Sequence, residues 1–254
     1  MAAGGREQVL VVGGGTFLGD HIAAALQAEG VPVAMLVRPG SEDMLGPLAE
    51  EITWAHGDPW NAASLKGRGR NARLVIHAVG GIQADKSQGI NHHSLNFLSL
   101  RNVANMCVTA GVPRMVYISA ARAPWLPRSY IRAKREAERY MARVGLRATV
   151  IRSPLLYRRG DPRPLSYRLM NLLATVTPFF RRTAPLPVDV FARGIARLVA
   201  ADERDRRSIY YAADLRRLNT PEERRGEQVA VPSALMLEEP PLNEADTQPG
   251  APVG

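Results

Sequence analysis

The sequence predicts an α/β protein built on a doubly wound parallel sheet, and three observations support this fold class. Short apolar runs alternate with helical patterns from Gln8 to Ile151. Most of these runs are apolar on both faces, as strands are when helices cover a parallel sheet from two sides. With 46% hydrophobic and 22% charged residues among 254, the chain can bury a proper core. Fibrous, disulfide-stapled and wholly disordered classes are therefore excluded.

The individual elements follow from the local pattern. Strands are expected where short runs of apolar and β-branched residues occur, at 8–12, 32–37, 52–55, 74–78, 115–119, 148–151 and 208–212. Helices are expected where apolar residues recur every three or four positions, at 17–29, 41–50, 87–110, 129–144 and 188–201. A further apolar stripe lies within 163–182 and has arginines at both of its ends.

A single domain is expected over residues 1–215, in which about 155–205 forms a small C-terminal cap. Residues 216–254 are expected to be a disordered tail. From Asn219 to Gly254 the chain has seven acidic residues, two basic residues and six prolines, with little apolar periodicity. Because the net charge of the whole chain is +9, the body that precedes this acidic tail is more basic still.

The positive charge is carried by 30 arginines and only 3 lysines. Two explanations stay open. One is a genome that favours arginine, and the other is an anionic partner, such as a dinucleotide phosphate, a nucleic acid or a lipid surface.

Cysteine content and hydropathy set the expected compartment. The single cysteine, Cys107, cannot form an internal disulfide, which indicates a reducing environment. No stretch approaches the ~18 apolar residues that a membrane-spanning helix needs, and no targeting segment is visible. We expect the protein in the cytoplasm of a bacterium or in an organelle matrix. The stripe from Leu169 to Phe180 leaves contact with a membrane surface open.

A glycine-rich turn joins the first expected strand to the first expected helix. Its residues are Gly13, Gly14, Gly15, Thr16, Phe17, Leu18 and Gly19. Glycines at this place let the backbone bend sharply and approach a pyrophosphate, whose charge is met by free amides and the positive end of the helix. Thr16 stands where a glycine is often found, so its side chain either crowds the phosphate or offers it a hydroxyl. The turn predicts a Rossmann-type dinucleotide site.

The ends of the next strands refine the choice of cofactor. Arg38 follows the second strand at a position where a carboxylate favours NAD(H) and an arginine favours the 2′-phosphate of NADP(H). NADP(H) is therefore preferred, and NAD(H) stays open. Asp58, after the third strand, is expected to accept from the adenine amino group. Ala78, Val79 and Gly80, after the fourth, are expected along the middle of the cofactor.

Ser119, Tyr130 and Lys134 form the expected catalytic group. Tyr130 and Lys134 are four residues apart on an expected helix, so both side chains can enter one cleft. A neighbouring ammonium stabilises phenolate and lowers a phenol pKa that starts near ~10, which suits proton transfer. Lys134 can also hold the nicotinamide ribose, and Ser119 can hold a carbonyl oxygen. His92 and His93 have no other ligand-type neighbours, so no metal site is expected.

These motifs resemble the short-chain dehydrogenase/reductase superfamily, in its extended or atypical branch. Further segments that carry the resemblance are Gly57–Asp58, Asn96–Asn102, Ala110–Val112, Val116–Ser119 and Val150–Pro154. The resemblance implies that Asn96, Pro154, Tyr130 and Lys134 also bind the cofactor. The stretch from Arg128 to Glu138 resembles two NAD(P)(H)-binding groups in particular. These are the accessory nucleotide-binding subunit of respiratory complex I and a fungal coenzyme Q biosynthesis protein.

The main functional expectation is an NADP(H)-dependent oxidoreductase that acts on a carbonyl or hydroxyl group of an unidentified small molecule. Sugar nucleotides are less favoured, because the region after Pro154 is short. The alternative is a catalytically inactive, nucleotide-bound subunit of a membrane-associated respiratory or quinone-biosynthesis complex. A minor alternative is an RNA-binding relative of the epimerases. The sequence argues against a nucleic-acid partner, because no stacking aromatics are interleaved with its arginines.

Overall fold

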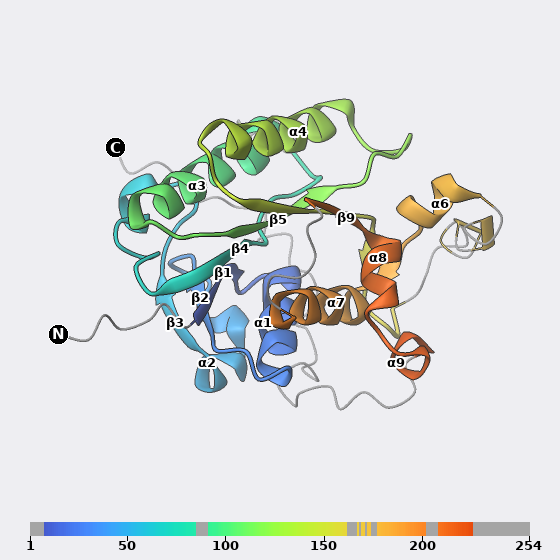
Figure 1. The fold of residues 1–254 in the computed structure, drawn as a ribbon, viewed down its shortest axis with the longest axis horizontal. Helices are drawn as coiled ribbons and strands as arrows, with labels where there is room; N and C mark the ends of the chain where they lie inside the picture. Colours follow the sequence, from blue (N-terminus) through green and yellow to red (C-terminus); the bar gives the residue numbers. More distant parts are fainter. Residues whose placement is uncertain are drawn as a thin grey trace.

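The structure is a computed structural model and describes residues 8–84, 91–161, 167, 169–170, 172–173, 177–201 and 208–225. Its centre is a seven-stranded parallel sheet with the order β3-β2-β1-β4-β5-β6-β9 (Figure 1). The strands are β1 (Gln8–Gly14), β2 (Val33–Val37), β3 (Thr53–His56), β4 (Ala72–His77), β5 (Met115–Ala120), β6 (Ala148–Ser153) and β9 (Ile209–Tyr211). The strand order reverses between β1 and β4, which is where ligands bind in such sheets. The predicted doubly wound fold is confirmed.

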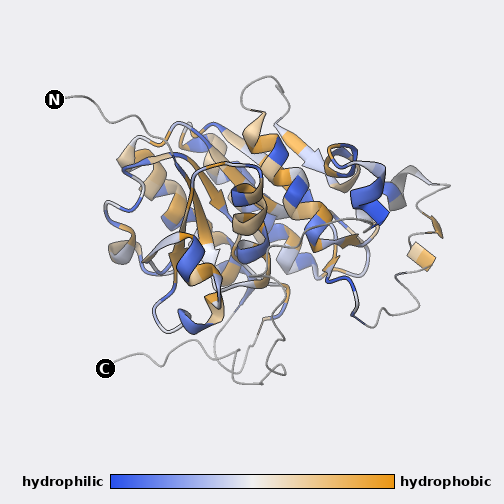
Figure 2. Ribbon diagram, turned by 90° about the horizontal axis from the view of Figure 1, so that it is seen from below, coloured by the Kyte–Doolittle hydropathy of each residue, from blue (hydrophilic) through white to orange (hydrophobic). Residues whose placement is uncertain are grey.

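Helices cover both faces of the sheet, with α1 and α7 on one side and α3 and α4 on the other (Figure 1). Their bounds are α1 (Phe17–Ala28), α3 (Ser99–Ala110), α4 (Arg128–Arg143) and α7 (Val188–Ala200). Each face has its own apolar core. Leu26 and Phe191 are fully buried on the first face, and Leu100 and Met141 are fully or almost fully buried on the second. Figure 2 shows the strands as predominantly hydrophobic, whereas the helices carry hydrophilic residues as well.

Two expected helices are more irregular than their patterns predict. Residues 41–50 divide into a 3-10 turn, η1 (Asp43–Leu45), and a short helix, α2 (Leu48–Glu51). Gly46, with φ 52°, and Pro47 separate them, because neither residue favours a helix interior. In the described part of the expected 87–110 helix, a π turn, η3 (Ser94–Leu98), precedes α3. A 3-10 turn, η2 (Ala62–Leu65), follows β3.

The C-terminal part holds a small second sheet, which the sequence did not predict. It consists of β7 (Leu156–Tyr157) paired with β8 (Leu186–Pro187), and α6 (Pro178–Thr183) precedes β8. Helices α8 (Ala212–Arg217) and α9 (Pro221–Arg225) continue the fold past the expected boundary at 215. The Glu223 carboxylate accepts a hydrogen bond from Arg197 at 2.6 Å, which holds α9 to α7.

Much of the predicted 163–182 stripe and the tail from residue 226 onward lie outside the described residues. Within the part of the chain that the structure describes, no helix is both long and apolar enough to cross a membrane.

Candidate functional site

The glycine-rich turn leads from β1 into α1. Gly13 and Gly15 have positive φ angles of 127° and 74°, which side chains rarely adopt. Thr16 is the N-cap of α1. Its hydroxyl donates to the Gly13 carbonyl at 2.6 Å and accepts from the Gly19 amide at 3.2 Å. The Thr16 hydroxyl thus takes part in the turn itself, which neither sequence alternative included.

Gly19 is the point of closest approach between β1 and α1. A Cβ atom at this position would lie 2.0 Å from the Gly13 carbonyl oxygen. Only glycine can therefore let the first turn of the helix pack against the strand end. Phe17 stays partly exposed, whereas Leu18 packs against the apolar core beneath α1.

Asp20 is a polar contact of this turn that sequence reasoning missed. Its Oδ1 accepts from the Gly15 amide at 2.9 Å. Burial raises the pKa of the Asp20 carboxyl to about 7, and hydrogen bonds from the Gly15 and Thr16 amides oppose that shift only in part. A signal was present in the sequence, because acidic residues favour the first turn of a helix.

We expect Asp20→Asn to stabilise the protein at pH 8. Because the pKa in the folded state lies above that of the unfolded chain, the free energy of unfolding falls as the pH rises from about 4 to about 7. An asparagine can still accept from the Gly15 amide but has no charge to desolvate. Thermal unfolding should show a gain of about 1–2 kcal/mol at pH 8 that shrinks toward pH 5. The same gain in Asp43→Asn, at an exposed aspartate, or a gain independent of pH, would contradict this account.

The segment after β2 lies against the glycine-rich turn. A Cβ atom on Gly15 would come within 2.6 Å of the Ser41 carbonyl oxygen. Arg38, three residues earlier, is exposed, and its carbonyl accepts from the Ser41 amide at 3.0 Å. The structure therefore places Arg38 beside the turn. Asp58 follows β3 and uses Oδ1 to accept from the Trp60 amide at 2.9 Å.

Gly80, Asn96 and Lys134 meet beyond the carboxyl end of β4. Ala78 and Val79 are buried there, while Gly80 is exposed and has φ 119°. A Cβ atom on Gly80 would lie 2.4 Å from Asn96 Oδ1 and 3.0 Å from Lys134 Nζ. Three residues that the sequence assigned separately to the cofactor are thus brought together.

Asn96 is held inside the π turn. Its Nδ2 donates to the carbonyls of Gly81 at 2.9 Å and His92 at 3.1 Å. Its Oδ1 is buried and has no hydrogen-bond partner among the described residues. A buried acceptor without a partner carries a free-energy cost, so this oxygen is available to a hydroxyl donor placed beside Gly80.

Lys134 and Tyr130 lie side by side on α4, as their spacing predicted. Lys134 is buried, and its Nζ donates to the Ile118 carbonyl at 3.0 Å and lies 5.8 Å from the centre of the Tyr130 ring. Burial lowers the pKa of Lys134 to about 7 and raises the pKa of Tyr130 to about 12. The sequence predicted that Lys134 would lower the pKa of the Tyr130 phenol, but desolvation has the larger effect and raises it. Desolvation also lowers the pKa of Lys134. Tyr130 is consequently protonated at neutral pH and able to donate.

Ser119 points into a different network. Its hydroxyl donates to Glu138 Oε1 at 2.6 Å and accepts from Arg135 at 3.0 Å. Glu138 also accepts from Arg152 at 2.8 Å. The arginines and Ser119 together hold the pKa of the Glu138 carboxyl below its usual value, against the effect of burial. Pro154 follows β6, and its carbonyl accepts from the Ser153 hydroxyl at 2.8 Å.

Comparison with known proteins independently supports the binding of a nicotinamide dinucleotide. Residues 13–181 match a family model described as NAD(P)H-binding. The chain is 29% identical over 204 residues to a ceramide reductase of Caulobacter vibrioides, covering 79% of this chain and 62% of that protein. It is 24% identical to short-chain dehydrogenase/reductase family 42E member 1 of Xenopus laevis, covering 63% and 49%. The chain thus spans less than two thirds of either relative.

Solved structures with the same fold bind either nicotinamide cofactor. The enzyme WbmH of Bordetella bronchiseptica, in complex with NAD+, superposes with a TM-score of 0.58 at 18% identity, covering 81% of this chain and 75% of that one. A wide-type short-chain dehydrogenase/reductase of Veillonella parvula, in complex with NADP, gives 0.56 at 16% identity, covering 78% and 88%.

Proposed function

Because the chain belongs to the NAD(P)H-binding family of the short-chain dehydrogenase/reductase superfamily, we propose that it is an NADP(H)-dependent oxidoreductase acting on a carbonyl or hydroxyl group. One observation carries this proposal. The glycine-rich turn and Gly80 follow the adjacent strands β1 and β4, and Lys134 Nζ donates to the Ile118 carbonyl of the next strand, β5, and lies beside Gly80.

The residues of this edge fit a dinucleotide. Gly13 and Gly15 add no side chains to the turn, and the first turn of α1 offers amides to a pyrophosphate. Gly80 leaves open the approach to Lys134 Nζ and to the unpartnered Asn96 Oδ1. These groups would hold the ribose that carries the nicotinamide. The nicotinamide, when bound, supplies or accepts a hydride.

Tyr130 is the proposed proton donor. Its phenol is protonated at neutral pH, because burial raises its pKa to about 12. In the reducing direction it would give its proton to the carbonyl oxygen as that oxygen gains negative charge. Lys134 lies 5.8 Å from the phenol ring, and a positive charge there stabilises the phenolate that remains.

Ser119 supports a second candidate, a nucleotide-bound protein without turnover of its own. The Ser119 hydroxyl, expected to orient a substrate oxygen, is engaged with Glu138 and Arg135. Such a protein would serve as a structural or assembly subunit, as the resemblance to the complex I and coenzyme Q proteins suggests.

Two measurements separate the oxidoreductase from the non-catalytic candidate. The first is calorimetry with NADPH and NADH, and the second is an assay of NADPH oxidation over a panel of aldehydes, ketones and quinones. The proposal expects micromolar binding of NADPH and substrate-dependent oxidation. Binding without oxidation of NADPH by any member of the panel would favour the second candidate. Failure to bind either nucleotide would overturn both.

We expect Arg38→Ala to weaken the binding of NADPH by about tenfold or more and to leave NADH within about twofold. A guanidinium at the end of β2 can pair with the 2′-phosphate, which NADH lacks. Arg101→Ala, at an exposed arginine of α3, is the matched control. An equal loss for both nucleotides would show that Arg38 does not select between them.

A further inference from the structure

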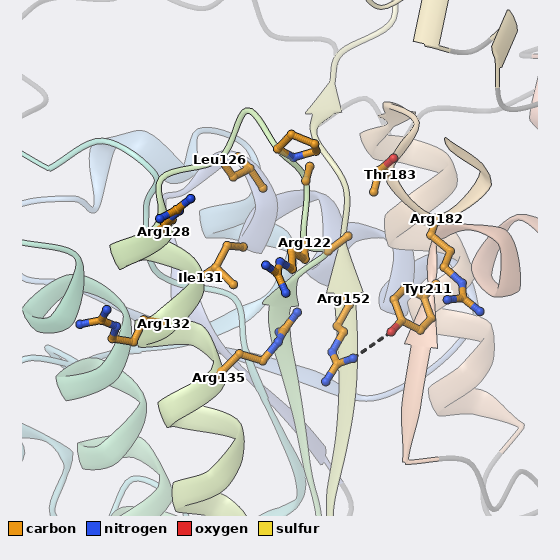
Figure 3. A pocket seen from close by; sticks show the side chains of 13 residues that line it. Arg122, Leu126, Arg128, Ile131, Arg132, Arg135, Arg152, Arg182, Thr183 and Tyr211 are labelled. Carbon is orange, nitrogen blue, oxygen red and sulfur yellow. Dashed lines mark hydrogen bonds between the residues drawn. The ribbon is translucent and has the colours of Figure 1, made fainter. Parts of the chain in front are cut away.

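An arginine-rich pocket lies beside the candidate site, at the carboxyl edge of β5 and β6 (Figure 3). Its volume is about 870 Å³. The arginines that line it are Arg122, Arg128, Arg132, Arg135, Arg152 and Arg182. They come from four parts of the fold, namely the segment after β5, the first turns of α4, strand β6 and helix α6. The sequence showed that arginine is abundant and left an anionic partner as one of two explanations, but it did not predict this pocket.

Most of this positive charge has no acidic partner. Glu138 pairs with Arg135 and Arg152. Across the described ranges, no carboxylate lies within ion-pair distance of Arg122, Arg128 or Arg132. Guanidinium groups gathered around one pocket repel one another, so an anion placed among them would relieve that repulsion.

The floor of the pocket is fixed before any ligand enters. Arg152 donates to the Tyr211 hydroxyl at 2.8 Å, as Figure 3 shows, and to Glu138 at 2.8 Å. Arg135 donates to the Ala120 carbonyl at 2.8 Å and to the Ser119 hydroxyl at 3.0 Å. Because these partners hold both guanidiniums in place, little side-chain entropy is lost when they bind an anion. The Arg182 guanidinium lies over the Tyr211 ring, 5.2 Å from its centre.

Strand β5 connects the pocket to the candidate site. The Ile118 carbonyl holds Lys134 Nζ, and Ala121 lines the pocket three residues later. A strand rises about 3.3 Å per residue, so the two positions are about 10 Å apart along the chain. A small organic molecule can span that distance, with its anionic group in the pocket and its reacting carbon near Tyr130.

We propose that this pocket binds the phosphoryl group of a soluble phosphate ester, which is the substrate of the oxidoreductase proposed above and so rests on that function. Phosphate is favoured over a single carboxylate for two reasons. It carries up to two negative charges, and its three free oxygens can accept paired hydrogen bonds from several guanidiniums at once.

Inorganic pyrophosphate is the probe, titrated by calorimetry into the full chain after saturation with NADPH, so that the glycine-rich turn is already filled. We expect one pyrophosphate per chain. The double variant Arg122→Gln/Arg132→Gln, at two exposed arginines without described acidic partners, should weaken its binding by about tenfold or more. The control double variant Arg101→Gln/Arg139→Gln removes the same charge from exposed positions of α3 and α4 outside the pocket and should change pyrophosphate binding by less than about twofold.

Several outcomes would overturn the proposal. These are no binding at about 10 mM pyrophosphate, equal binding by the pocket double variant and the control double variant, or citrate binding as tightly as pyrophosphate. Capture by vesicles containing phosphatidic acid, without binding of pyrophosphate or glycerol phosphate, would assign the pocket to a lipid headgroup instead. If the expected pattern appears but no carbonyl compound is reduced, the anion site stands and the oxidoreductase function fails.

Discussion

Tyr130→Phe should lower substrate-dependent oxidation of NADPH by about 10²-fold or more, while the affinity for NADPH changes by less than about threefold. The substitution removes the phenolic proton but keeps the buried ring that packs beside Lys134 and His92. Because phenylalanine keeps the ring and occupies the same buried space, the fold should tolerate the change. Single-turnover kinetics with deuterated NADPH would show whether the lost rate belongs to the chemical step.

Tyr140→Phe is the matched control for this experiment. Tyr140 lies on the same helix, and its hydroxyl donates to Asn105 of α3 at 2.6 Å. We expect it to retain turnover within about twofold. Equal rates in Tyr130→Phe and the unmodified protein would remove Tyr130 from the proton-transfer step and favour the non-catalytic candidate.

Gly19→Ala should lower the stability of the fold by about 3 kcal/mol and abolish nucleotide binding at ordinary concentrations. In most helix interiors, replacing glycine by alanine is stabilising by about 1 kcal/mol. Here the added methyl group would lie 2.0 Å from the Gly13 carbonyl oxygen, so α1 must move away from β1. Thermal unfolding should show a fall in Tm of about 6–12 °C.

Gly30→Ala separates this clash from ordinary glycine effects. Gly30 has φ 69° and open space around its Cα atom, so alanine there brings backbone strain without a collision. We expect a loss of about 1 kcal/mol and unchanged nucleotide binding. If Gly19→Ala were no more harmful than Gly30→Ala, close packing at the turn would not be the reason for glycine at position 19.

The fold was largely predictable, because a buried parallel strand and an amphipathic helix leave different periodicities in the sequence. All seven strands of the main sheet lie where apolar runs were recognised, with end points that differ by a few residues. The pairing of β7 with β8 left no such trace, since each contributes only two residues that contact each other across a long connection.

The sequence by itself determined the order of strands and helices, the glycine-rich turn and the shared face of Tyr130 and Lys134, because these depend on neighbouring residues and on helical spacing. Tertiary structure alone decided what surrounds them. It set Gly80 and Asn96 against Lys134, turned Ser119 toward Glu138, and gathered arginines from four parts of the fold around one pocket. The pKa values of Asp20, Tyr130 and Lys134 likewise follow from burial, which depends on atoms that the rest of the chain brings near them.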